Sequence, residues 1–158
     1  MTEFTDIAQN RWWGPRLVWY LWRRRNRPFR WGSNDCVTLA NAAARLQNGL
    51  DLMRLYPEYR SGHGARSIIA KNGGHTGLLD RVMARLDKTR DGCIVMFEGR
   101  AERRTGAHGW DFLYGVVYRD RVYVPTATGI AEIDPDTIQL LAGWDPCRVR
   151  TAALEELT

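Results

Sequence analysis

The change of hydrophobic period near Asp91 constrains the fold of this chain more than any other feature. Before it, apolar residues recur at helical spacing, most clearly in the segment 76–86. After it, short apolar runs alternate with turns that contain glycine, proline or aspartate, which is typical of strands. Helices followed by strands predict an α+β fold in which N-terminal helices pack on a C-terminal antiparallel sheet.

The same patterns set the expected elements and domain limits. We expect helices over Pro15–Arg25, Asp35–Gln47, Ala65–Asn72 and Thr76–Leu86, and strands over Cys93–Phe97, Phe112–Tyr118, Arg121–Val124 and Gly129–Ile133. Ile138–Leu141 is expected to be a last strand or a turn. A chain of 158 residues is long enough to bury one core. We therefore expect an N-terminal arm over 1–10, a single domain over 11–150 and a C-terminal tail over 151–158.

The segment Phe29–Cys36 reads Phe-Arg-Trp-Gly-Ser-Asn-Asp-Cys, and an alanine-rich helical pattern follows it. This order places Cys36 in the first turn of a helix, where unpaired backbone N–H groups and the helix dipole stabilise a thiolate. Ser33 or Asn34 is the expected N-cap, while Asp35 either caps the helix or pairs with a nearby arginine. Cys36 is therefore a candidate nucleophile, and the alternative is a small buried core residue.

The segment Trp31–Cys36 resembles the nucleophile motif of NlpC-type cysteine peptidases of the papain superfamily. It is more similar still to a branch of that group carried by tailed phages and gene-transfer agents. The resemblance continues as weaker spacings through Tyr59–Ser61, Asp91–Val95 and Trp144, so that it covers roughly residues 12–146. It implies an NlpC-like fold and a role at the tail tip or baseplate, or in tail assembly. It also implies other tail or baseplate proteins as partners and a place in the virion tail, with assembly in the host cytoplasm.

The sequence departs from the active family at the general base. The family carries a histidine on a strand that reads roughly His-Val-Gly-Ile-Tyr, and the matching segment here begins with Leu113. The next strand, over 122–126, offers neither a histidine nor a carboxylate. His108, five positions before Leu113, is the candidate substitute base, ahead of His63 and His75. Because a thiol without a base is a poor acyl-transfer catalyst, we expect a degenerate site. An active amidase that cuts peptidoglycan peptides is the alternative.

Residues 11–30 form a basic, aromatic segment with seven arginines, four tryptophans and no acidic residue. Tryptophan and arginine are the side chains that most often anchor protein interfaces. We therefore expect this segment to contact another protein chain through Trp12, Trp13, Trp19, Trp22, Arg23, Arg24 and Arg25. The alternative is a nucleic-acid-binding module, which we disfavour because no nucleic-acid-binding fold motif accompanies the basic segment.

Composition narrows the remaining functional classes. The net charge is +5, and only Lys71 and Lys88 among the 23 basic residues are lysines. Cys36, Cys93 and Cys147 lie far apart without a Cys-x-x-Cys pair, so we expect no metal site, no disulfide framework and no cofactor. No signal peptide is visible, and no apolar stretch is long enough to predict a membrane span.

Overall fold

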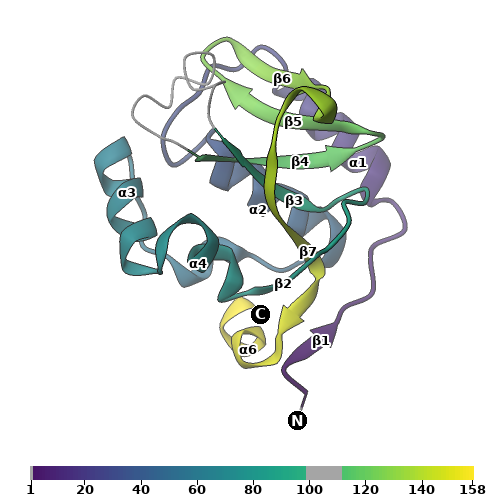
Figure 1. Ribbon diagram of the computed structural model, residues 1–158, viewed down its shortest axis with the longest axis vertical. Coiled ribbons are helices and arrows are strands. Elements are labelled where there is room, and N and C mark those ends of the chain that lie inside the picture. The colour runs from purple at the N-terminus through teal and green to yellow at the C-terminus, as the bar shows by residue number, and fades with distance from the viewer. Residues whose placement is uncertain (1, 99–111) are drawn as a thin grey trace.

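The computed structural model describes residues 2–98 and 112–158, and it is an α+β protein with a seven-stranded antiparallel sheet (Figure 1). The helices are α1 (Trp13–Arg23), α2 (Cys36–Asn48), α3 (Gly62–Lys71), α4 (Gly74–Asp80) and α6 (Leu154–Leu157). Three short 3-10 turns are η1 (Leu52–Leu55), η2 (Pro135–Thr137) and η3 (Thr151–Ala153). The strands are β1 (Phe4–Asp6), β2 (Met83–Arg85), β3 (Ile94–Glu98), β4 (Phe112–Tyr118), β5 (Arg121–Thr126), β6 (Gly129–Ile133) and β7 (Leu140–Arg150).

Strand β7 organises the sheet. The strand order is β1-β7-β3-β4-β5-β6, and β2 also pairs with β7. The first half of β7 pairs with β3, and its second half pairs with β1 and β2. Trp144 stands at the crossover, opposite both Ile94 and Arg85. Strand β7 therefore connects β1, near the N-terminus, to the central strands β3 and β4.

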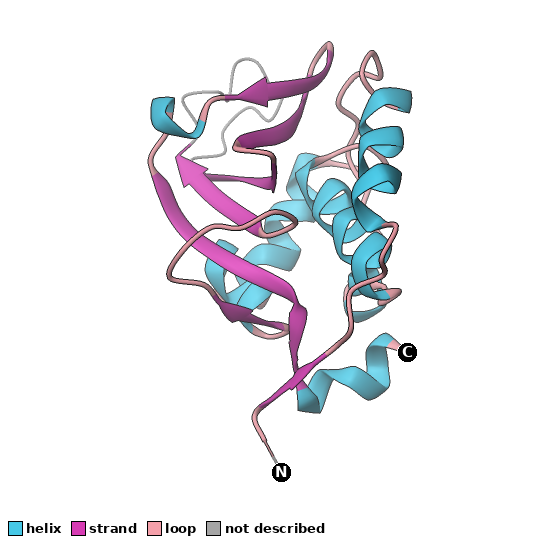
Figure 2. Ribbon diagram, turned by 90° about the vertical axis from the view of Figure 1, so that its right-hand side faces the viewer, coloured by secondary structure: helices cyan, strands magenta, loops and turns pink. Residues whose placement is uncertain are grey.

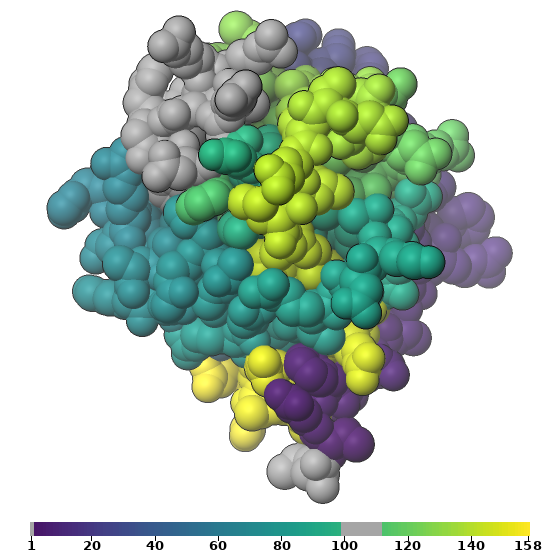
Figure 3. All heavy atoms as spheres, viewed as in Figure 1, coloured from purple at the N-terminus to yellow at the C-terminus, as the bar shows by residue number. Residues whose placement is uncertain are grey.

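The helices α1 and α2 lie on one side of the sheet (Figure 2), and the space-filling view of the opposite side shows part of strand β7 at the surface (Figure 3). The main core lies between the sheet and α2, α3 and α4, and its largest fully buried side chains include Trp144, Tyr114 and Phe97. A second cluster places Leu17 and Leu21 of α1 against α2 and β4. Helix α1 is thus fixed to the domain along a single buried stripe.

The α+β architecture expected from the sequence is confirmed, but several expected elements are different. The helix expected over Thr76–Leu86 is helical only as far as Asp80, where α4 ends, and its second half was wrong because Met83–Arg85 pairs with β7 as β2. The apolar run at the end of that segment suits a buried strand as well as a helix face. The sheet also takes strands from before residue 90, so it is not built from the C-terminal half alone.

The chain ends also differ from the expected arm and tail. Residues Phe4–Asp6 pair with Arg148–Arg150 as edge strand β1. In the C-terminal segment Leu157 is only 2% exposed, so it packs into the main core. Strand β7 continues past Pro146 because the register of its pairing with β2 shifts there, which leaves Pro146 without a ladder partner.

Candidate functional site

Cys36 is the first residue of α2, as expected, and it is only 2% exposed. Burial, and secondarily the charge of Asp35, raises the pKa of the thiol from 9.0 to about 12. Backbone hydrogen bonds involving Tyr114, Cys36 and Val37 oppose this shift without cancelling it. At neutral pH the sulfur is therefore a protonated thiol, the form that is not nucleophilic.

Asp35, rather than Ser33 or Asn34, is the N-cap of α2. Its Oδ1 accepts a hydrogen bond from the Thr38 N–H at 2.8 Å, and the Asp35 N–H donates to Thr38 Oγ1 at 2.9 Å. Its Oδ2 accepts from the Gly32 N–H at 2.8 Å and from the Tyr59 hydroxyl at 2.6 Å. Burial, and then the Asp35 carboxylate, holds the pKa of Tyr59 well above its usual range. The carboxylate is 1% exposed, and its hydrogen bonds tie the helix start to the 59–60 segment.

Asn34 and Gly32 shape the loop before the helix, while Ser33 is exposed. The Asn34 side-chain amide donates to the carbonyls of Arg27 and Pro28 at 3.2 and 2.9 Å. Gly32 has a φ of +80°, and a Cβ there would lie 2.0 Å from the Tyr59 carbonyl oxygen. We refer to Gly32, Asn34, Asp35, Cys36 and Tyr59 as the cysteine corner. Its polar groups bond to one another and to the adjacent backbone.

The expected base position holds no proton acceptor. Leu113 lies in β4 opposite Phe97 and is fully buried. His108, the candidate substitute base, lies outside the described residues. His75 is the second residue of α4, with its ring centroid 5.5 Å from that of Phe112 and 6.1 Å from that of Tyr114, and His63 is exposed on α3. Among the described residues, no histidine contributes to the pKa shift of Cys36.

A hollow of about 540 Å³ lies beside the cysteine corner. It is lined by Arg30, Trp31, Gly32, Ser33, Thr38, Met53, Glu58, Tyr59 and Arg60. Cys36 is not part of this lining, because its side chain points into the core on the other side of the cap. A ligand in this hollow would meet the loop and the Tyr59 segment rather than the sulfur.

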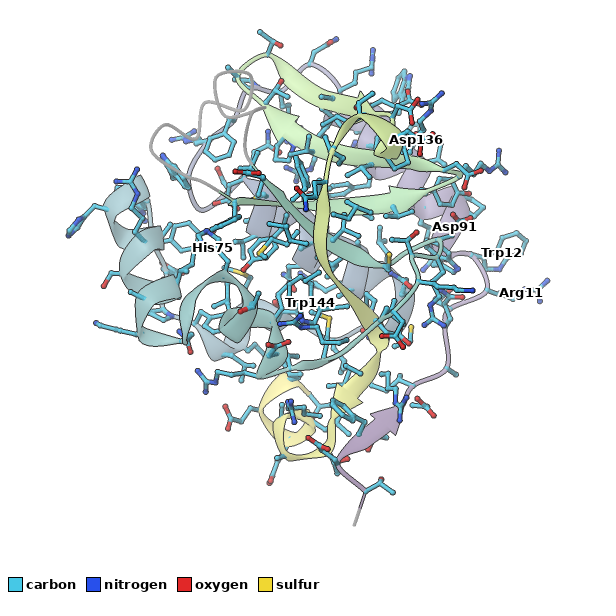
Figure 4. The ribbon with its side chains drawn as sticks, viewed as in Figure 1. Arg11, Trp12, His75, Asp91, Asp136 and Trp144 are labelled. Carbon is cyan, nitrogen blue, oxygen red and sulfur yellow. The ribbon has the colours of Figure 1, made fainter. Side chains whose placement is uncertain are left out.

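The outer face of α1, which we define as Trp12, Arg16, Val18, Trp19, Trp22 and Arg23, is exposed to solvent. Trp12, Trp19 and Trp22 are 54%, 58% and 52% exposed. The rings of Trp19 and Trp22 stack at 5.3 Å, and the Arg25 guanidinium lies 3.9 Å from the Trp22 ring centroid. Figure 4 shows the neighbouring Arg11 and Trp12 projecting from the edge of the molecule. This face combines large apolar surface with positive charge.

The other residues assigned to the interface from sequence lie differently. Trp13 is half-buried and packs edge-on against Tyr118 at 5.6 Å in the second core cluster. Arg24 is half-buried, with its guanidinium 4.6 Å from the Tyr20 ring centroid. Arg25 is exposed, and its guanidinium donates to the Trp22 carbonyl at 2.7 Å. Trp13 therefore supports the helix from within the domain.

Comparison with known families gives one match. A family model described as a domain of unknown function, DUF6950, matches residues 9–144, which is most of the chain. The chain belongs to the DUF6950 family. The matched region begins just before α1, contains the whole cysteine corner and ends at Trp144 in β7. Searches of curated proteins and of solved structures each returned no match.

No group of three or more histidine, cysteine or acidic side chains in residues 2–98 and 112–158 is placed to hold a metal ion. Within the same residues, no helix has both the length and the apolar character needed to cross a bilayer.

Sequence reasoning missed two features of this DUF6950 chain. The bond from Tyr59 to Asp35 joins residues 24 positions apart, and no local pattern indicates it. Arg16, Tyr20 and Arg27 border a pocket with Trp19 and Leu46. The spacing of Arg16, Tyr20 and Arg23 along one helix could have indicated part of that pocket, since residues three or four apart lie side by side.

Proposed function

We propose that this chain is a structural or assembly component of a phage-type tail, at the tail tip or baseplate, with an NlpC-like fold whose cysteine is not catalytic. The observation that carries the proposal is the outer face of α1, where three tryptophans are more than half exposed (54%, 58% and 52%) beside arginines that form no ion pair with any described residue. The assignment to a tail rests on the resemblance of Trp31–Cys36 to the phage branch of the NlpC-type proteins.

The physical properties of that face favour a protein partner. Exposed tryptophan is the side chain that gains most from burial in an interface, and arginine beside it adds directional hydrogen bonds. Helix α1 already buries Leu17 and Leu21 on its inner stripe, so the outer tryptophans are not needed for its own packing. An assembly role accounts for a helix that is apolar on two sides.

The cysteine corner supports a non-catalytic role. A thiol whose pKa is about 12 is almost entirely protonated at neutral pH. Both oxygens of the adjacent carboxylate are engaged in the helix cap and the bond to Tyr59. Activation of Cys36 would require a base that reaches the buried sulfur. Leu113 occupies the position at which NlpC-type peptidases carry their histidine base.

Two assays test the proposal. Tails purified from the phage or gene-transfer element that encodes the chain should contain it, as detected by mass spectrometry, and deletion of its gene should leave tails incomplete in electron micrographs. The purified protein should release no peptides from peptidoglycan sacculi. Normal tails that lack the chain would overturn the assembly role. Peptide release that is lost in Cys36→Ala would establish the amidase alternative instead.

A further inference from the structure

A hollow of about 260 Å³ lies between α1 and α2, separate from the cysteine corner. It is lined by Arg16, Trp19, Tyr20, Arg23, Arg24, Arg27 and Leu46, and we call it the arginine pocket. Trp19, Tyr20 and Leu46 supply apolar surface, and the four arginines surround that surface with positive charge. The lining contains no acidic side chain.

No ion pair within residues 2–98 and 112–158 neutralises the positive charge of this pocket. None of the ion pairs among the described residues involves an arginine of the segment 11–30. The Arg24 guanidinium lies over the Tyr20 ring and has a long contact of 3.4 Å with Asn34 Oδ1. A guanidinium stacked on a ring keeps its N–H edge available, and that edge matches a carboxylate with two parallel hydrogen bonds.

The backbone of residues 25–28, beside the arginine pocket, is held by hydrogen bonds within the chain itself. The Arg25 carbonyl accepts a hydrogen bond from the Ile130 N–H at 3.2 Å. Gly129 permits this approach, since a Cβ there would lie 1.9 Å from the Arg25 oxygen. The Asn34 amide binds the Arg27 and Pro28 carbonyls from the other side. A pre-ordered pocket loses little conformational entropy on binding.

We propose that the arginine pocket receives a carboxylate, an aspartate or glutamate side chain carried next to apolar residues on a segment of a partner protein. This inference rests on the proposed assembly role and names the chemistry of the partner. The four arginines of the pocket favour an acidic segment because the charges are opposite. Trp19, which is exposed, and Leu46 favour apolar residues beside the acidic one.

The surroundings of the tryptophans favour protein over nucleic acid or membrane. Trp22 stacks on Trp19 and carries Arg25 against its ring, so a base that stacked on Trp22 would compete with these two groups. Insertion of the same indoles into a bilayer would carry the guanidinium of Arg25, and that of Arg11 on Trp12, towards the hydrocarbon. A protein surface can meet both groups, with carboxylates for the arginines and apolar side chains for the rings.

An unbiased displayed peptide library, selected against the purified full chain, tests this inference. The selected peptides should be enriched in Asp and Glu flanked by aromatic or aliphatic residues. A fluorescein-labelled selected peptide should bind more weakly as salt is raised, and replacement of its acidic residues by their amides should weaken it by about tenfold or more. The double variant Arg23→Gln/Arg27→Gln should show a similar loss. Arg45→Gln, on exposed α2 surface outside the pocket, should stay within about twofold.

Selection of no peptides, or of peptides without acidic enrichment, would overturn the inference. Equal binding to the double variant would also overturn it, as would tighter binding of the chain to a single-stranded DNA oligomer or to phosphatidylglycerol vesicles. Failure here is distinguishable from failure of the assembly role. If acidic peptides are not selected but tails still need the chain, only the pocket's partner chemistry is rejected. If acidic peptides bind but tails lack the chain, only the assembly role is rejected.

Discussion

The helix-start part of the cysteine corner, residues 32–36, follows the outer face of α1 closely in sequence, yet the polar groups of the two regions differ in their hydrogen bonding. In the corner, Asp35 is 1% exposed and its carboxylate receives hydrogen bonds from Thr38, Gly32 and Tyr59. On α1, Trp19 is 58% exposed, and the arginines around it form no ion pair among the described residues. Polar groups that are hydrogen-bonded within the chain indicate a structural role. Exposed tryptophans and arginines without ion pairs indicate a surface that binds another molecule.

The largest expected effect on folding concerns the glycine of the cysteine corner. Gly32→Ala should destabilise the protein by at least about 4 kcal/mol, because the left-handed backbone is strained by a side chain and the new Cβ meets the Tyr59 carbonyl. Gly49→Ala is the matched control, since Gly49 has a φ of +79° but nothing within 4 Å of its Cβ position. It should lose only about 1–2 kcal/mol in urea unfolding. If the two variants lose the same free energy of unfolding, the contact between residue 32 and the Tyr59 carbonyl does not contribute to the loss.

The next largest effect concerns the buried carboxylate. Asp35→Asn should lose about 2–3 kcal/mol, because the amide presents a donor to groups that themselves donate. Tyr59→Phe should lose less, about 1–2 kcal/mol, since only one hydrogen bond is removed. Asp134→Asn is the control at an exposed cap and should stay within about 1 kcal/mol. If thermal melts give Asp35→Asn the same small change as the control, the corner is not a structural network.

Alkaline pH should weaken the cysteine corner. The pKa of Cys36 is 9.0 for an ordinary thiol and about 12 in the folded chain, so the unfolded chain releases this proton first. Stability from this group is fully present below about pH 9 and is lost as the pH rises towards 12, by up to about 1.4 kcal/mol per pH unit. The raised pKa values of Tyr59 and Tyr114 act in the same direction.

Urea midpoints measured from about pH 8 to pH 11 check this expectation. The wild type should lose stability through that range, and Cys36→Ala should lose less because one of the titrating groups is gone. A profile in the wild type that is flat, or one that is unchanged by Cys36→Ala, would show that the thiol is not protected from ionisation by the fold.

The smallest expected effect on folding lies on α1. Trp19→Ala and Trp22→Ala should each change the free energy of unfolding by less than about 1 kcal/mol, because more than half of each ring is already exposed. Leu141→Ala, an exposed apolar residue on β7, is the control and should behave in the same way. A loss of several kcal/mol from either tryptophan would mean that the ring is part of the domain's own packing, which would remove the contrast with the corner.

The sequence was sufficient for the α+β class and for the place of Cys36 at a helix start, because period and capping chemistry are local. It was not sufficient to choose Asp35 over Asn34 or Ser33 as the cap, since the Asp35 carboxylate is also held by Tyr59, which lies 24 positions away in the sequence. Strands β1 and β2 were missed because three residues carry too short a pattern, and both exist by pairing with β7. The arginine pocket needed Leu46 of α2, which only tertiary packing brings to α1.

Complementation of a deletion strain is the most direct test of the claim that function lies on α1 and that the cysteine is structural. Two variants, Cys36→Ala and Trp19→Ala/Trp22→Ala, are compared in the phage or gene-transfer background that we propose for this chain, after thermal melts confirm that both fold. The account predicts that Cys36→Ala restores complete, infectious tails and that the double tryptophan variant does not. Restoration by the tryptophan variant together with failure of Cys36→Ala would contradict it.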